Sequence, residues 1–374
     1  MLNNKRIMFA AGGTGGHINP ALAVAGLIRE RYPMAEILFV GTKIKMEAKL
    51  VPDAGFEFKT IDISGFQRSI SLKNIKRNIG TLTKLFKSSG QAKKIITDFK
   101  PDVVIGFGGY VSGPVLRMAA KLDIKTAIHE QNAYPGITNK ALSKKVDIVM
   151  LTVKAAEKHF VSDNCVLTGL PIRGELVKAD RDISRAELGI DDRPMILSMG
   201  GSLGSRAVNE VVAELISAKH NEKKHHFYHA MGQYGLWLPS LLLEKGVDIE
   251  NEKEIVVREY INDMHRCLSA ADLVICRAGA SSLSEIQALG KPSILIPSPN
   301  VAENHQYHNA MALVNNNAAV IIEEKDLSAK RLIEEFDRLM NNPHKLKIIG
   351  ENAKKMAIFD AGERILGVVE SLIK

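Results

Sequence analysis

Short runs of apolar residues alternate with segments of helical periodicity along the whole chain. Such runs are typical of strands buried in a parallel sheet. They comprise residues 6–10, 36–40, 102–107, 125–129 and 147–151 in the first half, and 194–199, 225–230, 254–257, 272–276 and 292–297 in the second. Helical periodicity is clearest over residues 21–31, 207–219 and 327–340. Strands that alternate with helices indicate βαβ units, so the predicted fold class is α/β with parallel sheets.

The two halves of the chain resemble each other. RIMFAAGGTGG is similar to PMILSMGGSLG, 188 residues later, and PDVVIGFGG is similar to ADLVICRAG, 170 residues later. We therefore expect two doubly wound, Rossmann-like domains that face each other across a cleft, over residues 1–170 and 171–345. The stretch 346–374 is expected to be helical and to pack back on the first domain.

Composition adds few constraints. The 374 residues are 45% apolar and 25% charged, as in ordinary globular proteins. No apolar run reaches the length of a membrane-spanning helix, and the apolar stretch Ile7–Ala11 is too short for a signal peptide. The odd number of cysteines, without metal-ligand spacing, fits free thiols in a reducing cytoplasm; they are Cys165, Cys267 and Cys276.

Positive charge is concentrated in the first half of the chain. Residues 1–170 contain 25 Lys and Arg against 13 Asp and Glu, whereas the remainder has a net charge of −4. No acidic residue occurs between Ile63 and Thr97. The cations of this basic stretch are Arg68, Lys73, Lys76, Arg77, Lys84, Lys87, Lys93 and Lys94. Apolar residues recur among them at helical spacing, namely Ile75, Ile79, Leu82 and Phe86.

Two interpretations of the basic stretch 63–97 stay open. It is either a solvated helix with a core-facing apolar stripe, or a surface that binds an anionic membrane. Nucleic acid is not expected as a partner, because no aromatic residues are interleaved for base stacking.

Three glycine-rich or small-residue turns follow predicted strands. They are GGTGGH at 12–17, GGSLGS at 200–205 and RAGASS at 277–282. Each alone is typical of a tight strand-to-helix connection. Together, at the carboxyl ends of strands in two domains, they predict a site that binds phosphates through backbone amides and helix N-termini.

Two titratable residues are candidates for chemistry beside these turns. His17 lies at a predicted helix start, where the helix dipole favours a neutral imidazole, so it could act as a general base or only position the turn. Glu285 closes Ser282-x-x-Glu285, which is a capping-box pattern, and could instead bind ribose. The His-rich run 225–229 and Asp180-Arg181-Asp182 lack the setting of a metal site. No metal or other cofactor is therefore expected.

In combination, these motifs resemble the MurG family of N-acetylglucosaminyltransferases, in glycosyltransferase family 28. The matching segments run in order through the whole chain: GGTGGHINPALA, GFGGYVSGP, HEQNAYPGITNK, TGLPIR, GGSLGSRAVN, EYINDM, RAGASSLSE and NHQYHNA. Ser205 departs from the family pattern, which often has alanine there, and His305 stands where some members have glutamine.

The resemblance implies a GT-B fold, with UDP-GlcNAc bound by the second domain and the lipid-linked acceptor by the first. It implies an enzyme that transfers N-acetylglucosamine to undecaprenyl-diphosphate-linked muramoyl-pentapeptide with inversion at the anomeric carbon. The candidate catalytic base stays His17, on the strength of its place at the predicted helix start. The implied substrate-binding residues are Thr14, Gly15, Gly16, Asn132, Arg173, Ser202, Ile261, Ala280, Ser281, Ser282, Glu285 and Gln306.

Such an enzyme would act at the cytoplasmic face of the cell membrane as a peripheral protein. Two related enzymes remain as alternatives, a diacylglycerol glycosyltransferase and a UDP-GlcNAc epimerase. A basic module that binds nucleic acid or lipid without catalysis is a third alternative, although it leaves the turns of the acidic half unexplained.

Overall fold

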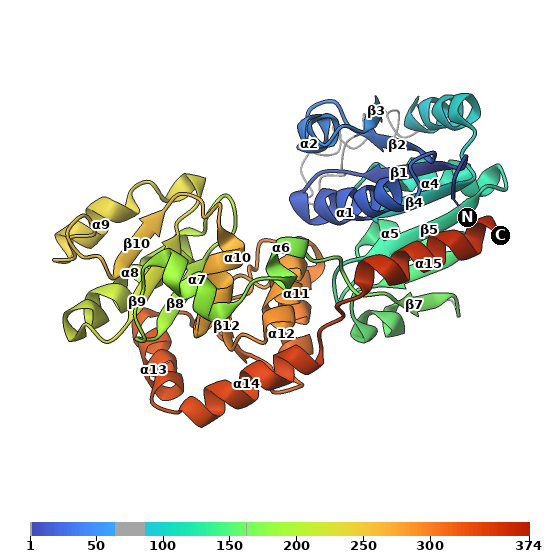
Figure 1. Ribbon diagram of the computed structural model, residues 1–374. Coiled ribbons are helices and arrows are strands. Elements are labelled where there is room, and N and C mark those ends of the chain that lie inside the picture. The colour runs from blue at the N-terminus through green and yellow to red at the C-terminus, as the bar shows by residue number, and fades with distance from the viewer. Residues whose placement is uncertain (1, 64–86, 162) are drawn as a thin grey trace. The chain divides into compact units, whose positions relative to one another are not determined.

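The computed structural model describes residues 2–63, 87–161 and 163–374 (Figure 1). The chain forms two compact units, the first made of Met1–Pro171 with Asp360–Lys374 and the second of Ile172–Phe359. Each unit is a parallel β-sheet with helices on its faces. The predicted α/β class with two doubly wound sheets is confirmed.

The first unit contains a seven-stranded sheet in the order β3-β2-β1-β4-β5-β6-β7. Its strands are β1 (Arg6–Ala11), β2 (Glu36–Gly41), β3 (Glu57–Thr60), β4 (Val103–Gly108), β5 (Lys125–Glu130), β6 (Ile148–Leu151) and β7 (Cys165–Leu167). The helices of this unit include α1 (Gly15–Arg31), α2 (Glu47–Asp53), α4 (Ser112–Lys121), α5 (Ile137–Leu142), the 3₁₀ helix η1 (Lys154–His159) and α15 (Ala361–Ile373). Phe9 on β1 stacks on Phe39 of β2 with ring centroids 4.9 Å apart, so the core is centred on the middle strands.

The second unit repeats this topology with six strands in the order β10-β9-β8-β11-β12-β13. Its strands are β8 (Met195–Met199), β9 (His226–Ala230), β10 (Ile255–Arg258), β11 (Leu273–Cys276), β12 (Ser293–Leu295) and β13 (Val320–Ile321). β1 and β8 hold corresponding positions in the two sheets, and the strands beside them follow in the same order. This shared topology explains why the two halves of the sequence resemble each other. Alternate residues of β8 enter different core clusters, Leu197 on one face of the sheet and Ile196 on the other.

Helices cover both faces of the second sheet. The α-helices are α6 (Gly174–Val177), α7 (Arg181–Leu188), α8 (Arg206–Lys219), α9 (Leu238–Glu244), α10 (Met264–Ala270), α11 (Ala280–Leu289), α12 (His305–Val314), α13 (Ala329–Met340) and α14 (Pro343–Lys355). Short 3₁₀ helices are η2 (His220–Glu222), η3 (Gln233–Gly235), η4 (Ala302–Asn304) and η5 (Glu324–Asp326).

The C-terminal stretch is divided between the two units. The sequence suggested one returning segment over 346–374, but α14 stays with the second unit, where a Cβ on Gly350 would lie 2.4 Å from the carbonyl oxygen of Gly290, the C-cap residue of α11. Only α15 packs on the first unit, where Glu363 accepts hydrogen bonds at 2.6 and 2.7 Å from Arg31 of α1. The break falls at residues 356–360.

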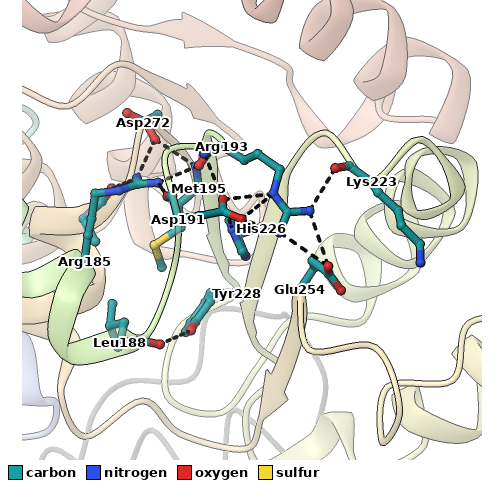
Figure 2. Close-up of polar contacts among 11 residues, drawn as sticks. Arg185, Leu188, Asp191, Arg193, Met195, Lys223, His226, Tyr228, Glu254 and Asp272 are labelled. Carbon is teal, nitrogen blue, oxygen red and sulfur yellow. Dashed lines mark hydrogen bonds and ion pairs between the residues drawn. The ribbon is translucent and has the colours of Figure 1, made fainter.

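A polar cluster fixes the amino-terminal edge of the second sheet (Figure 2). Asp272, just before β11, accepts hydrogen bonds from the Met195 backbone at 2.8 Å and from Arg185 at 3.1 Å. Nε2 of His226 lies 2.8 Å from Oδ1 of Asp191. These residues lie at the amino-terminal ends of the strands, whereas the small-residue turns follow the carboxyl ends. The cluster therefore stabilises the sheet and does not belong to the turns.

The basic stretch 63–97 is described only in part. Residues 64–86 lie outside the described residues, and with them Arg68, Lys73, Lys76, Arg77 and Lys84 and the predicted stripe of Ile75, Ile79, Leu82 and Phe86. Residues 87–99 are helical, with Ala92 and Ile96 buried and Lys93 and Lys94 exposed. Lys87 forms an ion pair of 2.9 Å with Asp62. Among the described residues no helix combines the length and apolarity needed to cross a membrane.

Candidate active site

The turn 12–17 joins β1 to α1 in the first unit. Thr14 is the N-cap residue of α1, and Gly15 and Gly16 form its first turn, with Thr14 and Gly16 exposed. Gly13 has a φ of +93°, a conformation that glycine adopts at little cost. The first N–H groups of a helix have no partner within it, so this turn is suited to an anionic or oxygen-rich ligand.

A second glycine pair closes on this turn from the end of β4. A Cβ on Gly109 would lie 2.3 Å from the Gly12 carbonyl oxygen, and one on Gly108 would lie 2.7 Å from Cδ2 of His17. The Ser112 hydroxyl accepts a hydrogen bond from the Gly108 N–H at 3.1 Å and lies 2.9 Å from the carbonyl oxygen of Ala10. The two turns therefore pack together only because neither glycine carries a side chain.

His17 is oriented by the backbone of its own turn. Its Nδ1 lies 3.1 Å from the Gly12 carbonyl oxygen and 3.3 Å from Oγ1 of Thr14. Because a carbonyl oxygen only accepts hydrogen bonds, Nδ1 carries the proton in this arrangement, and in the neutral imidazole Nε2 then carries the lone pair. This tautomer is the one that a general base acting through Nε2 requires.

The segment after β5 is organised by a buried carboxylate. Glu130 accepts hydrogen bonds from the Asn132 backbone at 2.9 Å, from the Asn132 side chain at 3.2 Å and from Asn139 at 2.8 Å. Burial raises the pKa of Glu130 and lowers that of His129 to about 4. His129 and Glu130 are buried within the unit, whereas Asn132 is half-buried.

The second unit contains a pocket of about 710 Å³ at the carboxyl ends of β8, β11 and β12. Three residues expected to bind substrate line it, Ser202, Ser282 and Gln306. The remaining lining residues are Met199, Gly200, Gly201, Leu203, Gly204, Ser205, Arg206, Ala207, Glu210, Cys276, Arg277, Gly279, Ser298, Asn300 and Glu324. Two of the small-residue turns found in the sequence thus meet at one pocket.

One wall of the pocket is the turn 200–205. It packs so closely on the segment after β9 that a Cβ on Gly204 would lie 2.2 Å from the Met231 carbonyl oxygen, and one on Gly232 would lie 2.0 Å from the Gly204 nitrogen. Ser205 then caps α8 by accepting a hydrogen bond from the Val208 N–H at 3.4 Å. Ser202 is exposed between these fixed points.

The opposite wall begins at α11. Gly279 is its N-cap residue, so Ala280, Ser281 and Ser282 form its first turn. The capping-box interpretation of Ser282 and Glu285 is therefore wrong, because both residues lie inside the helix. Glu285 instead accepts hydrogen bonds from Arg173, at 2.9 Å from Nε and 2.8 Å from Nη2. Burial raises the pKa of Glu285, and the guanidinium opposes that shift.

Ile261 and Gln306 contribute in different ways. Ile261 follows β10 with its side chain 2% exposed in the core, and it does not line the pocket. Only its backbone could therefore contact a base. Gln306 lies on the first turn of α12, and its Oε1 accepts a hydrogen bond from the Ser298 N–H at 2.9 Å.

An ion pair at the pocket was not singled out from the sequence. Arg277 donates hydrogen bonds to the Ile296 carbonyl oxygen at 3.0 Å, to the Ser205 hydroxyl at 2.5 Å and to Glu324. It connects β11, β12 and the turn before α8, and its side chain is only 12% exposed. Arg277 opens the RAGASS motif, but Glu324 follows the two-residue strand β13, which no hydrophobic run in the sequence predicts.

Two of the residues considered for metal binding have structural partners. His226 pairs with Asp191 (Figure 2), and Asp180 caps α7 by accepting hydrogen bonds from the backbones of Asp182 and Ile183. Among the described residues, no group of three or more His, Cys, Asp or Glu side chains is arranged to hold a metal ion.

The chain belongs to glycosyltransferase family 28. Residues 7–151 match the family's N-terminal domain and residues 195–365 match its C-terminal domain. A protein of Acetivibrio thermocellus named UDP-N-acetylglucosamine–N-acetylmuramyl-(pentapeptide) pyrophosphoryl-undecaprenol N-acetylglucosamine transferase is 44% identical over 99% of this chain and 98% of its own length. The resemblance to the MurG family stated from the motifs is confirmed.

Solved structures agree with this assignment. MurG of Acinetobacter baumannii is 28% identical, with a TM-score of 0.78 over 98% of this chain and 99% of its own. A UDP-N-acetylglucosamine 2-epimerase is 12% identical, with a TM-score of 0.66 over 99% of this chain and 96% of its own, and shares the fold alone.

Proposed function

We propose that the protein transfers N-acetylglucosamine from UDP-GlcNAc to undecaprenyl-diphosphate-linked muramoyl-pentapeptide. The main support is the 44% identity, over nearly the full length, with the transferase of A. thermocellus whose name states these substrates. The pocket with its two small-residue turns supplies the nucleotide-binding chemistry that this reaction needs.

The two units take different substrates in this proposal. The second unit, predicted from the sequence to span 171–345, binds UDP-GlcNAc. Ala280, Ser281 and Ser282 bind phosphate through N–H groups and hydroxyls at the start of α11, where the helix dipole favours negative charge. Ser202 binds phosphate from the turn that precedes α8. In addition, Arg173 binds the diphosphate, Glu285 the ribose hydroxyls, the Ile261 backbone the uracil, and Gln306 the amino sugar.

The first unit binds the acceptor and supplies the base. His17 accepts the proton of the attacking hydroxyl at Nε2, the acceptor oxygen bonds to the anomeric carbon, and the bond from that carbon to UDP breaks with inversion. Thr14, Gly15, Gly16 and Asn132 contact the sugar and diphosphate. Positive charge for the departing diphosphate comes from Arg173 and the helix N-termini.

The acceptor's lipid places the reaction at a membrane. We propose that the basic stretch 63–97 binds an anionic membrane surface peripherally, on the cytoplasmic face. Its exposed Lys93 and Lys94 support this, since each cation near an anionic surface contributes about 1 kcal/mol. Replacing Lys73, Lys76, Arg77 and Lys84 by glutamine should reduce sedimentation with anionic vesicles and leave UDP binding intact. Added salt should reduce the sedimentation of the wild-type protein in the same way. Unchanged sedimentation of this variant would contradict the assignment.

The reaction is tested by measuring UDP release with different acceptors. Release should require the lipid-linked muropeptide. Release with diacylglycerol, or an epimerised sugar nucleotide formed without any acceptor, would instead identify one of the two alternative enzymes. A thermal shift with UDP but not with ATP or NAD would exclude a non-catalytic basic module, and no shift with millimolar UDP would favour it.

A further inference from the structure

Glu47 is a buried carboxylate that links two loops of the first unit. It begins α2, is 0% exposed, and lies just after β2. Its Oε2 accepts a hydrogen bond from the Gly13 N–H at 3.0 Å. Its Oε1 accepts two from Thr42, at 3.1 Å from the backbone N–H and 2.6 Å from the hydroxyl. Both carboxylate oxygens are thus bonded, one of them to the turn that precedes α1.

Two glycines leave the space that this side chain occupies. A Cβ on Gly12 would lie 2.6 Å from Oε1 of Glu47, and a Cβ on Gly41 would lie 2.6 Å from its Cγ. A side chain at Gly12, the first glycine of the GGTGGH motif, would therefore displace the Glu47 carboxylate. Because both glycines lack a side chain, the Glu47 carboxylate packs directly against the turn 12–17.

The peptide group between Gly12 and Gly13 connects Glu47 to His17. Its N–H donates to the Glu47 carboxylate at 3.0 Å, and its C=O accepts from Nδ1 of His17 at 3.1 Å. A hydrogen bond from an amide to an anion is stronger than a neutral one, and it polarises the amide so that the carbonyl oxygen becomes a better acceptor. The negative charge on Glu47 therefore strengthens the hydrogen bond that the His17 imidazole donates, through a single polarised peptide group.

We propose that Glu47 is a positioning residue for His17 and acts through the Gly12–Gly13 peptide. It fixes the tautomer with the proton on Nδ1 and makes Nε2 more basic, as a carboxylate directly hydrogen-bonded to a histidine does. The inference rests on the proposed function in that it assigns His17 as the base. Its effect on the tautomer, however, can be observed without catalysis.

The variant Glu47→Gln tests the contribution of charge, because it keeps the shape of the side chain. We expect kcat to fall about 10- to 100-fold, as for other groups that orient a functional histidine, with the KM for UDP-GlcNAc little changed. The acid limb of the pH–rate profile should move to lower pH, since an imidazole without the nearby negative charge protonates less readily. Glu57→Gln is the matched control, because Glu57 is an exposed carboxylate of the same unit.

Nitrogen-15 NMR of the imidazole gives a readout that a purely structural role would not change. In the wild-type protein the His17 signals, assigned with His17→Gln, should show a protonated Nδ1 and an unprotonated Nε2. In Glu47→Gln they should move toward a mixture of tautomers. Thr42→Val, which removes one anchoring bond but keeps the charge, should leave both the tautomer and the acid limb in place.

Three results would overturn the proposal. The first is a wild-type His17 protonated on Nε2, which needs no variant and so decides the matter even where Glu47→Gln fails to fold. The second is a folded Glu47→Gln with unchanged nitrogen signals. The third is a loss of kcat without movement of the acid limb. Absence of transfer by the wild-type protein would contradict the proposed function instead, and the tautomer measurement would still stand.

Discussion

Arg173 and Glu285 are paired with each other, although each is assigned to a different part of the nucleotide. Nε and Nη2 of Arg173 lie 2.9 and 2.8 Å from the same oxygen of Glu285. The side chain of Glu285 is 13% exposed and that of Arg173 is 49% exposed, so the arginine is the partner with room to move. A bound nucleotide would therefore have to exchange this ion pair for an arginine–diphosphate contact and a carboxylate–ribose contact.

Arg173→Ala should weaken binding of UDP but not of uridine. A charge-assisted hydrogen bond to the diphosphate contributes about 1.5–3 kcal/mol, and part of this offsets the lost pair with Glu285. We therefore expect the Kd for UDP to rise roughly tenfold, which corresponds to about 1.4 kcal/mol. Uridine should bind as well or better, because the carboxylate is released for its ribose. Isothermal titration calorimetry with both ligands measures this split.

Lys178→Ala is the control for this experiment, since Lys178 is an exposed cation five residues away. It should leave both dissociation constants unchanged. Equal weakening of UDP and uridine by Arg173→Ala would show that the arginine supports the pocket rather than the diphosphate.

His17→Ala should lower turnover far more than donor binding. General base catalysis contributes about 10²- to 10⁴-fold, so kcat should fall by that order while the KM for UDP-GlcNAc changes less. Steady-state assays of UDP release with the lipid-linked acceptor measure both constants. His344→Ala, at an exposed position of the second unit, is the control. A nearly normal kcat in His17→Ala would reduce His17 to a residue that only holds the turn.

Arg277→Met should destabilise the second unit. Removing one partner of a buried ion pair costs about 3–5 kcal/mol, and the partial exposure of Glu324 favours the lower value. The double variant with Glu324→Gln should recover part of the loss, because it no longer leaves a carboxylate without its partner. Urea unfolding followed by the fluorescence of Trp237, the single tryptophan of the chain, reports on this unit. If the double variant is no more stable than Arg277→Met, an unpaired Glu324 is not the cause of the destabilisation.

The stability of the second unit should fall as the pH drops from about 6.5 toward 4. Burial lowers the pKa of His229 from 6.5 to about 4, so the unfolded chain binds a proton in this interval that the folded unit does not. At about 1.36 kcal/mol per pKa unit, the free energy of unfolding should decrease by roughly 2 kcal/mol between pH 6.5 and 5 on account of this group.

Urea titrations of Trp237 fluorescence at several pH values measure the slope. His229→Gln should flatten it, whereas His129→Gln, a change at an equally buried histidine of the first unit, should not. An unaltered slope in His229→Gln would mean that other groups account for the acid sensitivity.

The sequence pattern predicted ten of the thirteen described strands but not β3, β7 and β13. These three lie at or near sheet edges, are two to four residues long, and contain few residues that are fully buried. Their hydrophobic pattern is correspondingly weak. The break between α14 and α15 was also missed, because helical periodicity continues on both sides of residues 356–360 while the packing partner changes from one unit to the other.

In the candidate site too, features with a local sequence signal were predicted and long-range contacts were not. Turns such as 12–17 and 200–205 were found because glycines after a strand are a local signal. Glu47 and Arg277 were not assigned a role, since the contacts that join them to the turns 12–17 and 200–205 span 34 and 72 positions along the chain. In a single sequence, a carboxylate that begins a short helix looks the same whether it faces water or orients a histidine.

The return of α15 to the first unit makes the second unit an insertion in chain order. During synthesis Ile172–Phe359 is complete before α15 emerges, so the second unit can fold while the first still lacks its last helix. Ile365, Leu366 and Val369 of α15 are nearly fully buried in the core around β1 and α1. Until they arrive, the apolar surface that these side chains cover in the first unit lacks its partner, so the first unit completes its core last.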